Sequence, residues 1–115
     1  MSVRFTLPYP PSLNRLYRHV GPMVLISREG REYKKRVGWL ALEQRVTKQA
    51  GPLCVSLWLF RPTRRGDLDN TAKALLDALN GIAWVDDSQI VELHMYRGDD
   101  KTDPRAEIEV KTIGE

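Results

Sequence analysis

Residues 68–79 carry the clearest helical pattern in the chain, and the segments on either side of them restrict the fold. Polar and apolar side chains fall on opposite arcs of a helical wheel: Leu68, Ala72, Leu75, Leu76 and Leu79 on one, and Asp69, Asn70, Lys73 and Asp77 on the other. Gly81 supplies a stop signal for this helix. The apolar run Leu53–Phe60 before the helix predicts a buried strand, and Ile90–Tyr96 after it predicts another. The helix is therefore expected to pack its apolar arc on a sheet.

The rest of the chain supplies further strands and one more helix. Alternating apolar residues predict a strand over residues 3–7, and a short apolar run predicts another over residues 23–26. Ser27 is a good N-cap for a long helix that is expected to reach about Gln49, although Gly30 and Gly38 weaken that pattern. Together with a last strand over residues 106–110, these elements predict an α+β fold. We expect one domain over residues 1–115, with a mixed sheet of about five strands and two helices packed on it.

Charge is spread unevenly along the chain. Residues 1–50 hold ten Lys and Arg against three Glu, a net charge of +7, whereas residues 51–115 hold eight against twelve acidic residues, a net charge of −4. A basic half beside an acidic half suits a protein that grips a polyanion with one surface and holds a cation with another. On charge alone, an accidental asymmetry of a solvated surface remains an equal alternative.

Cys54 is the only cysteine, so the chain can form no internal disulfide and no zinc site built from several cysteines. His19 and His94 lack metal-ligand spacing relative to each other, and neither is assigned a catalytic role. No stretch approaches the roughly 18 consecutive apolar residues of a membrane helix, and Pro8, Pro10 and Pro11 interrupt the N-terminal segment where a signal peptide would need an apolar core. We expect a reduced, cytoplasmic protein with no membrane contact.

Four aspartates surround the helix at residues 68–79. Asp67 and Asp69 lie at its beginning, and Asp86 and Asp87 lie just beyond its end. Converging carboxylates repel one another unless a cation or protons relieve the clash. All four can meet only if a following strand folds the second pair back beside the first. Oxygen ligands of this kind suit Mg²⁺ or Mn²⁺ rather than zinc, and the natural chemistry is hydrolysis of a phosphodiester.

Each member of this cluster also has an ordinary structural explanation. Asp67 or Asp69 alone is more often a helix cap, and Asp86 and Asp87 alone are common turn residues. Lys73 follows Asp69 by four residues, a spacing that gives surface ion pairs of roughly 0.3–0.5 kcal/mol without any catalysis. The joint pattern at a helix N-terminus, which itself attracts phosphate, favours the metal site.

Two stretches, GDLDNTAKALLDALNG and WVDDSQIV, resemble the acidic core of RusA-type Holliday junction resolvases. The segments PPSLNRLYRH and SREGREYKKRV are also similar to that family, so the resemblance covers most of residues 4–97. It implies that Asp67, Asp69 and Asp87 hold the metal and that Lys73 is catalytic, while the part played by Asp86 stays open. Some family members have a basic residue immediately before the first aspartate, where this chain has Gly66.

The resemblance implies a Mg²⁺-dependent homodimer, with Mn²⁺ as a substitute ion, that resolves four-way DNA junctions in recombination and repair. Paired symmetric hydrolysis would leave 5′-phosphate and 3′-hydroxyl ends. We expect phosphate contacts from the basic N-terminal half and from the residues before the acidic core. The candidate DNA-binding residues are Asn14, Arg15, Tyr17, Arg18, Arg28, Arg31, Lys35, Arg64 and Arg65.

Three alternatives remain open. One is a non-catalytic module that binds branched DNA, and another is a metal-dependent nuclease that acts on flaps, forks or RNA. A purely structural assembly protein is the third, although it has no need for the acidic cluster. Trp84 either reaches the open centre of a junction or, as is commoner for tryptophan, is buried beneath its turn.

Overall fold

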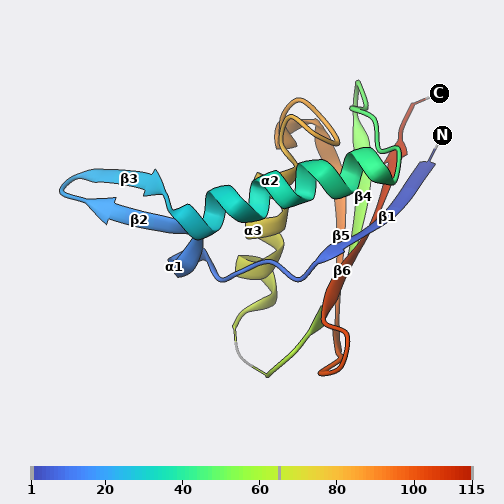
Figure 1. Ribbon diagram of the computed structural model, residues 1–115. Coiled ribbons are helices and arrows are strands. Elements are labelled where there is room, and N and C mark those ends of the chain that lie inside the picture. Colours follow the sequence, from blue (N-terminus) through green and yellow to red (C-terminus); the bar gives the residue numbers. More distant parts are fainter. Residues whose placement is uncertain (1, 65, 115) are drawn as a thin grey trace.

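A computed structural model describes residues 2–64 and 66–114, and within them a four-stranded mixed sheet is the main element. The strands lie in the order β1 (Ser2–Pro8), β6 (Arg105–Thr112), β4 (Leu53–Arg61), β5 (Ile90–Asp99). Strand β6 is antiparallel to β1 and β4, and β5 is parallel to β4. Helices α2 (Arg28–Glu43) and α3 (Leu68–Leu79) cover one face (Figure 1). The predicted α+β fold is confirmed.

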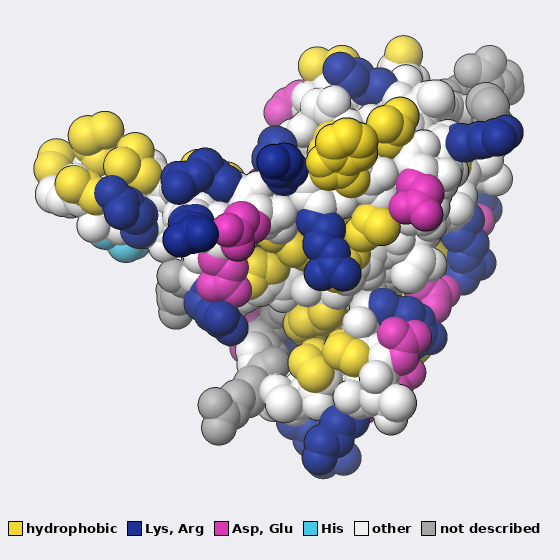
Figure 2. All heavy atoms as spheres, in the orientation of Figure 1, with side chains coloured by type: hydrophobic (Ala, Val, Ile, Leu, Met, Phe, Trp, Pro, Cys, Tyr) yellow, Lys and Arg dark blue, Asp and Glu magenta, His cyan; other side chains and the backbone are white. Residues whose placement is uncertain are grey.

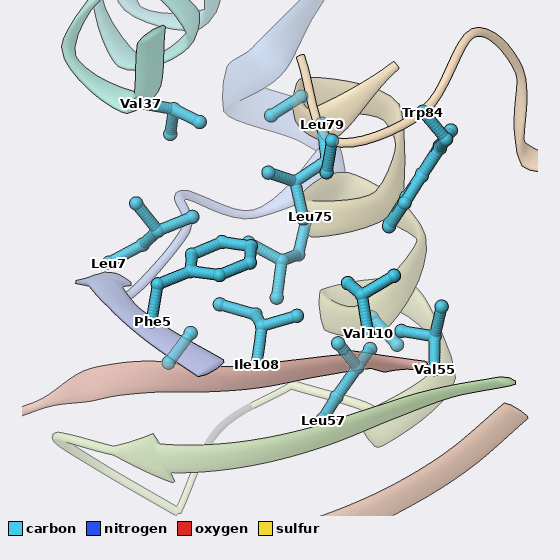
Figure 3. Packing of buried hydrophobic residues seen from close by; sticks show 14 of the residues in the cluster. Phe5, Leu7, Val37, Val55, Leu57, Leu75, Leu79, Trp84, Ile108 and Val110 are labelled. Carbon is cyan, nitrogen blue, oxygen red and sulfur yellow. The ribbon is translucent and has the colours of Figure 1, made fainter. Parts of the chain in front are cut away.

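The core lies between this covered face and the two helices. Register aligns Phe5, Ile108 and Leu57 in one row across β1, β6 and β4, because each side chain points to the helix side. Val37 of α2 and Leu75 of α3 pack over these rows (Figure 3). All five side chains are at most 3% exposed. Burial of large apolar side chains is worth roughly 1.5–3 kcal/mol each, which fixes both helices on the sheet.

Strand β4, helix α3 and strand β5 form a crossover unit, in which two parallel strands are joined through a helix. Helix α3 begins near the C-terminal end of β4 and returns along the sheet to the end where β5 begins (Figure 1). In register, Ile90 at the start of β5 pairs with Leu53 at the start of β4, and Asp99 pairs with Arg61 at the far end. The beginning of α3 and the beginning of β5 therefore lie at opposite ends of the sheet.

Helix α2 ends at Glu43, so the expectation that it reaches Gln49 is wrong. Arg45 adopts a left-handed φ of 61°, and the Val46 backbone N–H donates to the Ala41 carbonyl at 2.8 Å, which closes the helix. The Gln44 side chain donates to the Thr6 carbonyl at 2.7 Å and accepts from the Thr6 N–H at 2.9 Å. These two bonds tie the end of α2 to edge strand β1. No helix in the described parts of the chain is long and apolar enough to cross a membrane.

A β-hairpin projects from the body of the molecule, formed by β2 (Tyr17–Val20) and β3 (Met23–Ile26). The short helix α1 (Leu13–Leu16) precedes it. All five predicted strands are present, but the one over residues 23–26 pairs with β2 rather than with the main sheet (Figure 1). Strand β2 falls in a segment for which the sequence pattern predicts no strand. The hairpin carries part of the basic N-terminal half away from the core.

Candidate metal centre and nucleic-acid interface

Asp67 and Asp69 come together at the exposed N-terminus of α3. Gly66 has a φ of +86°, which allows the sharp turn before the helix, and its carbonyl accepts a hydrogen bond from Arg97 at 3.3 Å. Asp67 occupies the N-cap position, yet its carboxylate makes no capping hydrogen bond to the backbone. The Asn70 side chain donates to Asp67 at 3.3 Å, and the Asn70 backbone N–H donates to Asp69 at 2.9 Å. Both carboxylates face solvent beside the positive end of a helix.

Asp86 and Asp87 lie before β5, around the short 3-10 helix η1 (Asp87–Gln89). Asp86 caps this turn by accepting from the Ser88 N–H at 3.2 Å, and hydrogen bonds from the Ser88 side chain and backbone lower the pKa of the Asp86 carboxyl. The Asp87 carboxylate is exposed and has no polar partner among the residues that the structure describes. Asp86 therefore has a structural task, whereas Asp87 is free to bind a ligand.

The two acidic pairs do not meet within one chain. Asp67 and Asp69 lie at one end of α3, and Asp86 and Asp87 lie beyond its other end. The helix has 12 residues and so spans roughly 18 Å at 1.5 Å per residue. The following strand β5 does run back toward Asp67, but it begins only after Asp87 and leaves that residue behind (Figure 1). Within one protomer, β5 therefore does not fold Asp86 and Asp87 back beside Asp67 and Asp69, and the condition for all four aspartates to meet is not fulfilled there.

Lys73 lies one helical turn after Asp69 on the exposed side of α3. Its side chain lines a hollow with Tyr17 and Val24 of the hairpin and with Asp77. Within residues 2–64 and 66–114, its ammonium forms no ion pair with either neighbouring aspartate. The ordinary surface ion pair that its spacing allows is therefore not formed, and the charge is available to an anion.

The hairpin is fixed to α3 by Tyr17. Its hydroxyl donates to the Asp77 carboxylate at 2.9 Å, and burial together with this hydrogen bond raises the pKa of the Tyr17 phenol. A half-buried, hydrogen-bonded tyrosine is an anchor for the hairpin rather than a free platform for stacking bases. Arg18, on the same strand, is exposed.

The other candidate DNA-binding residues follow the hairpin and the first turns of α2, where Figure 2 shows Lys and Arg side chains gathered. Arg15 pairs with Glu29 at 3.1 Å, and Arg28 pairs with Glu32 at 3.2 Å. Arg31 donates to the Ile26 carbonyl at 3.0 Å, while Lys35 is exposed without such a bond in the described structure. Of the three remaining candidates, Arg64 is exposed and 3.9 Å from Asp99, while Arg65 and the side chain of Asn14 lie outside the described residues.

The residues that fix the loop before α3 could not be predicted from any sequence motif. Arg61 donates to Asp99, which is the main reason that the pKa of the Asp99 carboxyl is lowered, and Arg97 holds the Gly66 carbonyl. These contacts depend on the parallel pairing of β4 with β5, which local patterns do not reveal. Trp84 is fully buried and donates to Asn80 at 2.7 Å, so its expected burial beneath the turn is confirmed.

Comparison with known proteins identifies the family of the chain. The family model for endodeoxyribonuclease RusA matches residues 8–111. The chain is 34% identical to the crossover junction endodeoxyribonuclease RusA of Escherichia coli strain K12 over 112 residues, which cover 95% of this chain and 93% of that protein. It is 35% identical, with the same coverage, to the enzymes of that name from Enterobacteria phage 82 and from Shigella sonnei strain Ss046. The chain therefore belongs to the RusA family of endodeoxyribonucleases.

Proposed function

We propose that this protein is a Mg²⁺-dependent endonuclease that resolves four-way DNA junctions. The observation that carries this function is the exposed end of α3, where Asp67 and Asp69 lie beside Asn70 and one turn before Lys73, which forms no ion pair with any described residue. Relatives with 34–35% identity are named crossover junction endodeoxyribonucleases. Recombination and repair are the processes in which such junctions arise.

The donor set at α3 fits a hard divalent cation. Two exposed carboxylates offer oxygen ligands, and no Lys or Arg among the described residues pairs with either of them. Asp67, Asp69 and Asp87 are the proposed ligands, with Asp86 holding the turn that presents Asp87. Mg²⁺, or Mn²⁺ in its place, would supply Lewis-acid polarisation of the scissile phosphate. Lys73 would stabilise negative charge on the reacting phosphate as a point donor.

A homodimer would bring Asp87 to the other two ligands. Strand β5 is an edge strand, so its outer side can accept a second copy of itself. Antiparallel pairing about a two-fold axis near the middle of β5 would lay the beginning of one β5 beside the end of the other. Asp87 of one protomer would then approach Asp67 and Asp69 of its partner, and the dimer would hold two complete centres.

Exposed apolar side chains on β5 support this interface. Val91, Leu93 and Met95 alternate along the strand and are 62%, 39% and 36% exposed. Leu93 and Met95 continue the buried rows of the core beyond Val55 and Leu57, with which they pair, but neither helix buries them. When an apolar row extends to the edge strand of a sheet and no helix packs on it there, the exposed surface is typically covered by another protein chain.

Two such centres related by a two-fold axis suit paired, symmetric nicks in two strands of a junction, which would leave 5′-phosphate and 3′-hydroxyl ends. Phosphate contacts by Arg15, Arg18, Arg28, Arg31 and Lys35 would hold the DNA, with Arg64, Arg65 and Asn14 as further candidates, whereas Tyr17 keeps its bond to Asp77 and anchors the hairpin that carries Arg18. The proposed location is the cytoplasm, in association with DNA.

Cleavage of a strand-labelled synthetic four-way junction, with and without Mg²⁺, tests this function. The native protein should make paired symmetric nicks only with Mg²⁺. Asp69→Asn should bind the junction and leave it uncut. The variant replaces a charged carboxylate ligand by a neutral amide of similar size, so metal binding is weakened while the fold at the start of α3 is kept. Asp103→Asn, in the exposed turn between β5 and β6, is the matched control and should cut normally.

Each alternative function has its own outcome in that assay. Junction binding without nicks in the native protein, under any divalent ion, would identify a non-catalytic branched-DNA-binding module. Linear duplex, flaps, forks or RNA cut as readily as the junction would indicate a nuclease of another selectivity. Calorimetry that detects no Mg²⁺ or Mn²⁺ binding by the native protein would remove the metal assignment itself.

A further inference from the structure

The face of the sheet away from the helices carries a second cluster of metal-binding side chains. Cys54 of β4 pairs directly with Glu92 of β5, and Ser56 pairs with His94, so Cys54, Glu92 and His94 point to the same side. One potential ligand atom from each of the three lies within 4.8 Å of the others. Across residues 2–64 and 66–114, this is the one place where three such groups meet. The cluster is separate from the aspartates of the nuclease centre.

We propose that Cys54, Glu92 and His94 form a binding site for a divalent transition metal, with Zn²⁺ as the preferred ion. Sulfur, imidazole nitrogen and one carboxylate oxygen are the donor types that zinc takes in proteins. Mg²⁺ prefers oxygen alone, so the two centres of this chain would select different ions. Metal–ligand bonds of about 2.0–2.3 Å bring tetrahedral ligand atoms to roughly 3.3–3.8 Å from one another. The observed atoms lie within 4.8 Å of one another, so binding a metal would require the exposed Glu92 and His94 side chains to rotate toward Cys54.

The surroundings of the cluster leave these donors available. Glu92 and His94 are exposed, and neither forms an ion pair in the described parts of the chain. The charges of Glu109 and Lys111 on β6 also act on the Cys54 thiol, and these two side chains pair with each other at 3.7 Å. Burial, followed by a hydrogen bond to Glu92, raises the pKa of the Cys54 thiol, so a bound metal would replace the thiol proton.

The geometry gives the site a structural task. One ligand comes from the interior strand β4 and two come from the edge strand β5, so the metal would cross-link the edge strand to the sheet. Three protein ligands leave a fourth position for water or for a group from another molecule. This cross-link would make β5, the strand that follows Asp87, more rigid, without contributing a ligand to the nuclease centre.

Titration of the full-length protein with Co²⁺, an optical substitute for Zn²⁺, tests this site. Thiolate-to-cobalt charge-transfer absorption in the near ultraviolet can come only from Cys54, because the chain has no other cysteine. With excess Mg²⁺ present to fill the nuclease centre, we expect the charge-transfer band to saturate at one Co²⁺ per chain and to disappear when Zn²⁺ is added. Cys54→Ser should abolish the band. His94→Gln and Glu92→Gln should each weaken Co²⁺ binding by at least about tenfold, since even outer ligand partners have effects of that size.

Two controls separate this site from other binding. His19→Gln removes the other histidine, on the exposed hairpin, and should leave the titration unchanged. Asp69→Asn alters the nuclease centre and should also leave it unchanged. Thermal unfolding in chelator confirms that each variant is folded, and Glu92→Gln and His94→Gln change only exposed side chains. Absence of the band in native protein would overturn the proposal, as would a band of equal affinity in Glu92→Gln and His94→Gln.

Discussion

Two glycines in α2 occupy very different surroundings and make a matched pair. A Cβ at Gly30 would overlap the Leu16 carbonyl oxygen and lie 2.9 Å from the Ile26 side chain, whereas one at Gly38 would meet only Ile82, at 3.9 Å. Gly30→Ala should lower the free energy of unfolding by about 1–3 kcal/mol, because backbone must move to admit the methyl group. Gly38→Ala should raise it by about 0.5–1 kcal/mol through helix propensity. Urea denaturation measures both, and equal effects would contradict the close contact at Gly30.

A pH-dependent stabilisation is expected from Asp100, in the turn between β5 and β6. Its carboxylate accepts from the Asp103 N–H at 2.9 Å, from Arg105 at 2.9 Å and from the Thr102 N–H at 3.2 Å, and these bonds lower its pKa. A folded-state pKa below the unfolded value of about 3.9 stabilises the fold above that pH, and this effect is lost as pH falls through the folded pKa.

Asp100→Asn should therefore lower the Tm near neutral pH, and its difference from the native protein should shrink as the solution becomes more acidic than about pH 4. Thermal unfolding followed by circular dichroism at a series of pH values measures this difference. A difference as wide in acid as at neutral pH would show that the charge of Asp100 does not matter.

Single residues were predictable where their role depends on local chain geometry. Asp67, Asp69 and Lys73 share one helix start, so their grouping could be inferred from spacing alone. The capping bond of Asp86 and the bond between Tyr17 and Asp77 could not, because they depend on tertiary placement. The same limit applies to the trio on the outer face, whose members come together only through the register of β4 and β5.

At the scale of elements, the strands and α3 were predictable because their apolar periodicity reports burial directly. The end of α2 was not, because it is set by the left-handed Arg45 and by the bonds of Gln44 to Thr6 on a distant strand. Strand β2 was missed because its residues are polar or exposed and its pairing with β3 leaves no buried face.

The projecting hairpin should contribute charge to DNA binding. Arg18 is exposed on β2 and has no ion-pair partner in the part of the chain that the structure describes. Arg18→Ala should weaken binding of every junction sequence by a similar factor and reduce the slope of log affinity against log salt by about 1. Lys111→Ala removes a positive charge from the outer sheet face and is the control, which should keep the native slope. Fluorescence anisotropy over a range of salt concentrations measures both, and an unchanged slope for Arg18→Ala would exclude a phosphate contact there.

At the scale of the whole molecule, the separation of the acidic pairs sets the arrangement of the proposed dimer. A centre inside one protomer would need Asp87 to cross the length of α3, which packs on the core through Leu75 and Leu79. Exchange of Asp87 between protomers needs no such rearrangement, because opposite ends of antiparallel edge strands lie side by side. Sequence alone could not distinguish these arrangements, since either one gathers the same residue types.

Mixing two inactive variants distinguishes a metal centre built from residues of both protomers from one built within a single protomer. If Asp87 acts in the partner's centre, a heterodimer of Asp69→Asn with Asp87→Asn has one centre with both substitutions and one with neither. After subunit exchange of equal amounts, half of the dimers are mixed and each has one intact centre, so about a quarter of the native centres should return. These dimers should nick one strand instead of two. Nicking of the labelled junction measures the recovery.

Mixing Asp69→Asn with Asp67→Asn provides the matched control. In the shared arrangement both centres of that heterodimer keep a substitution, because each protomer brings its own altered α3, so no cleavage should return. If each centre lies within one protomer, both mixtures should stay inactive, since every centre then carries one substitution. Recovery in the first mixture alone thus requires that Asp87 act across the two-fold axis, and it ties catalysis by this small domain to its dimerisation.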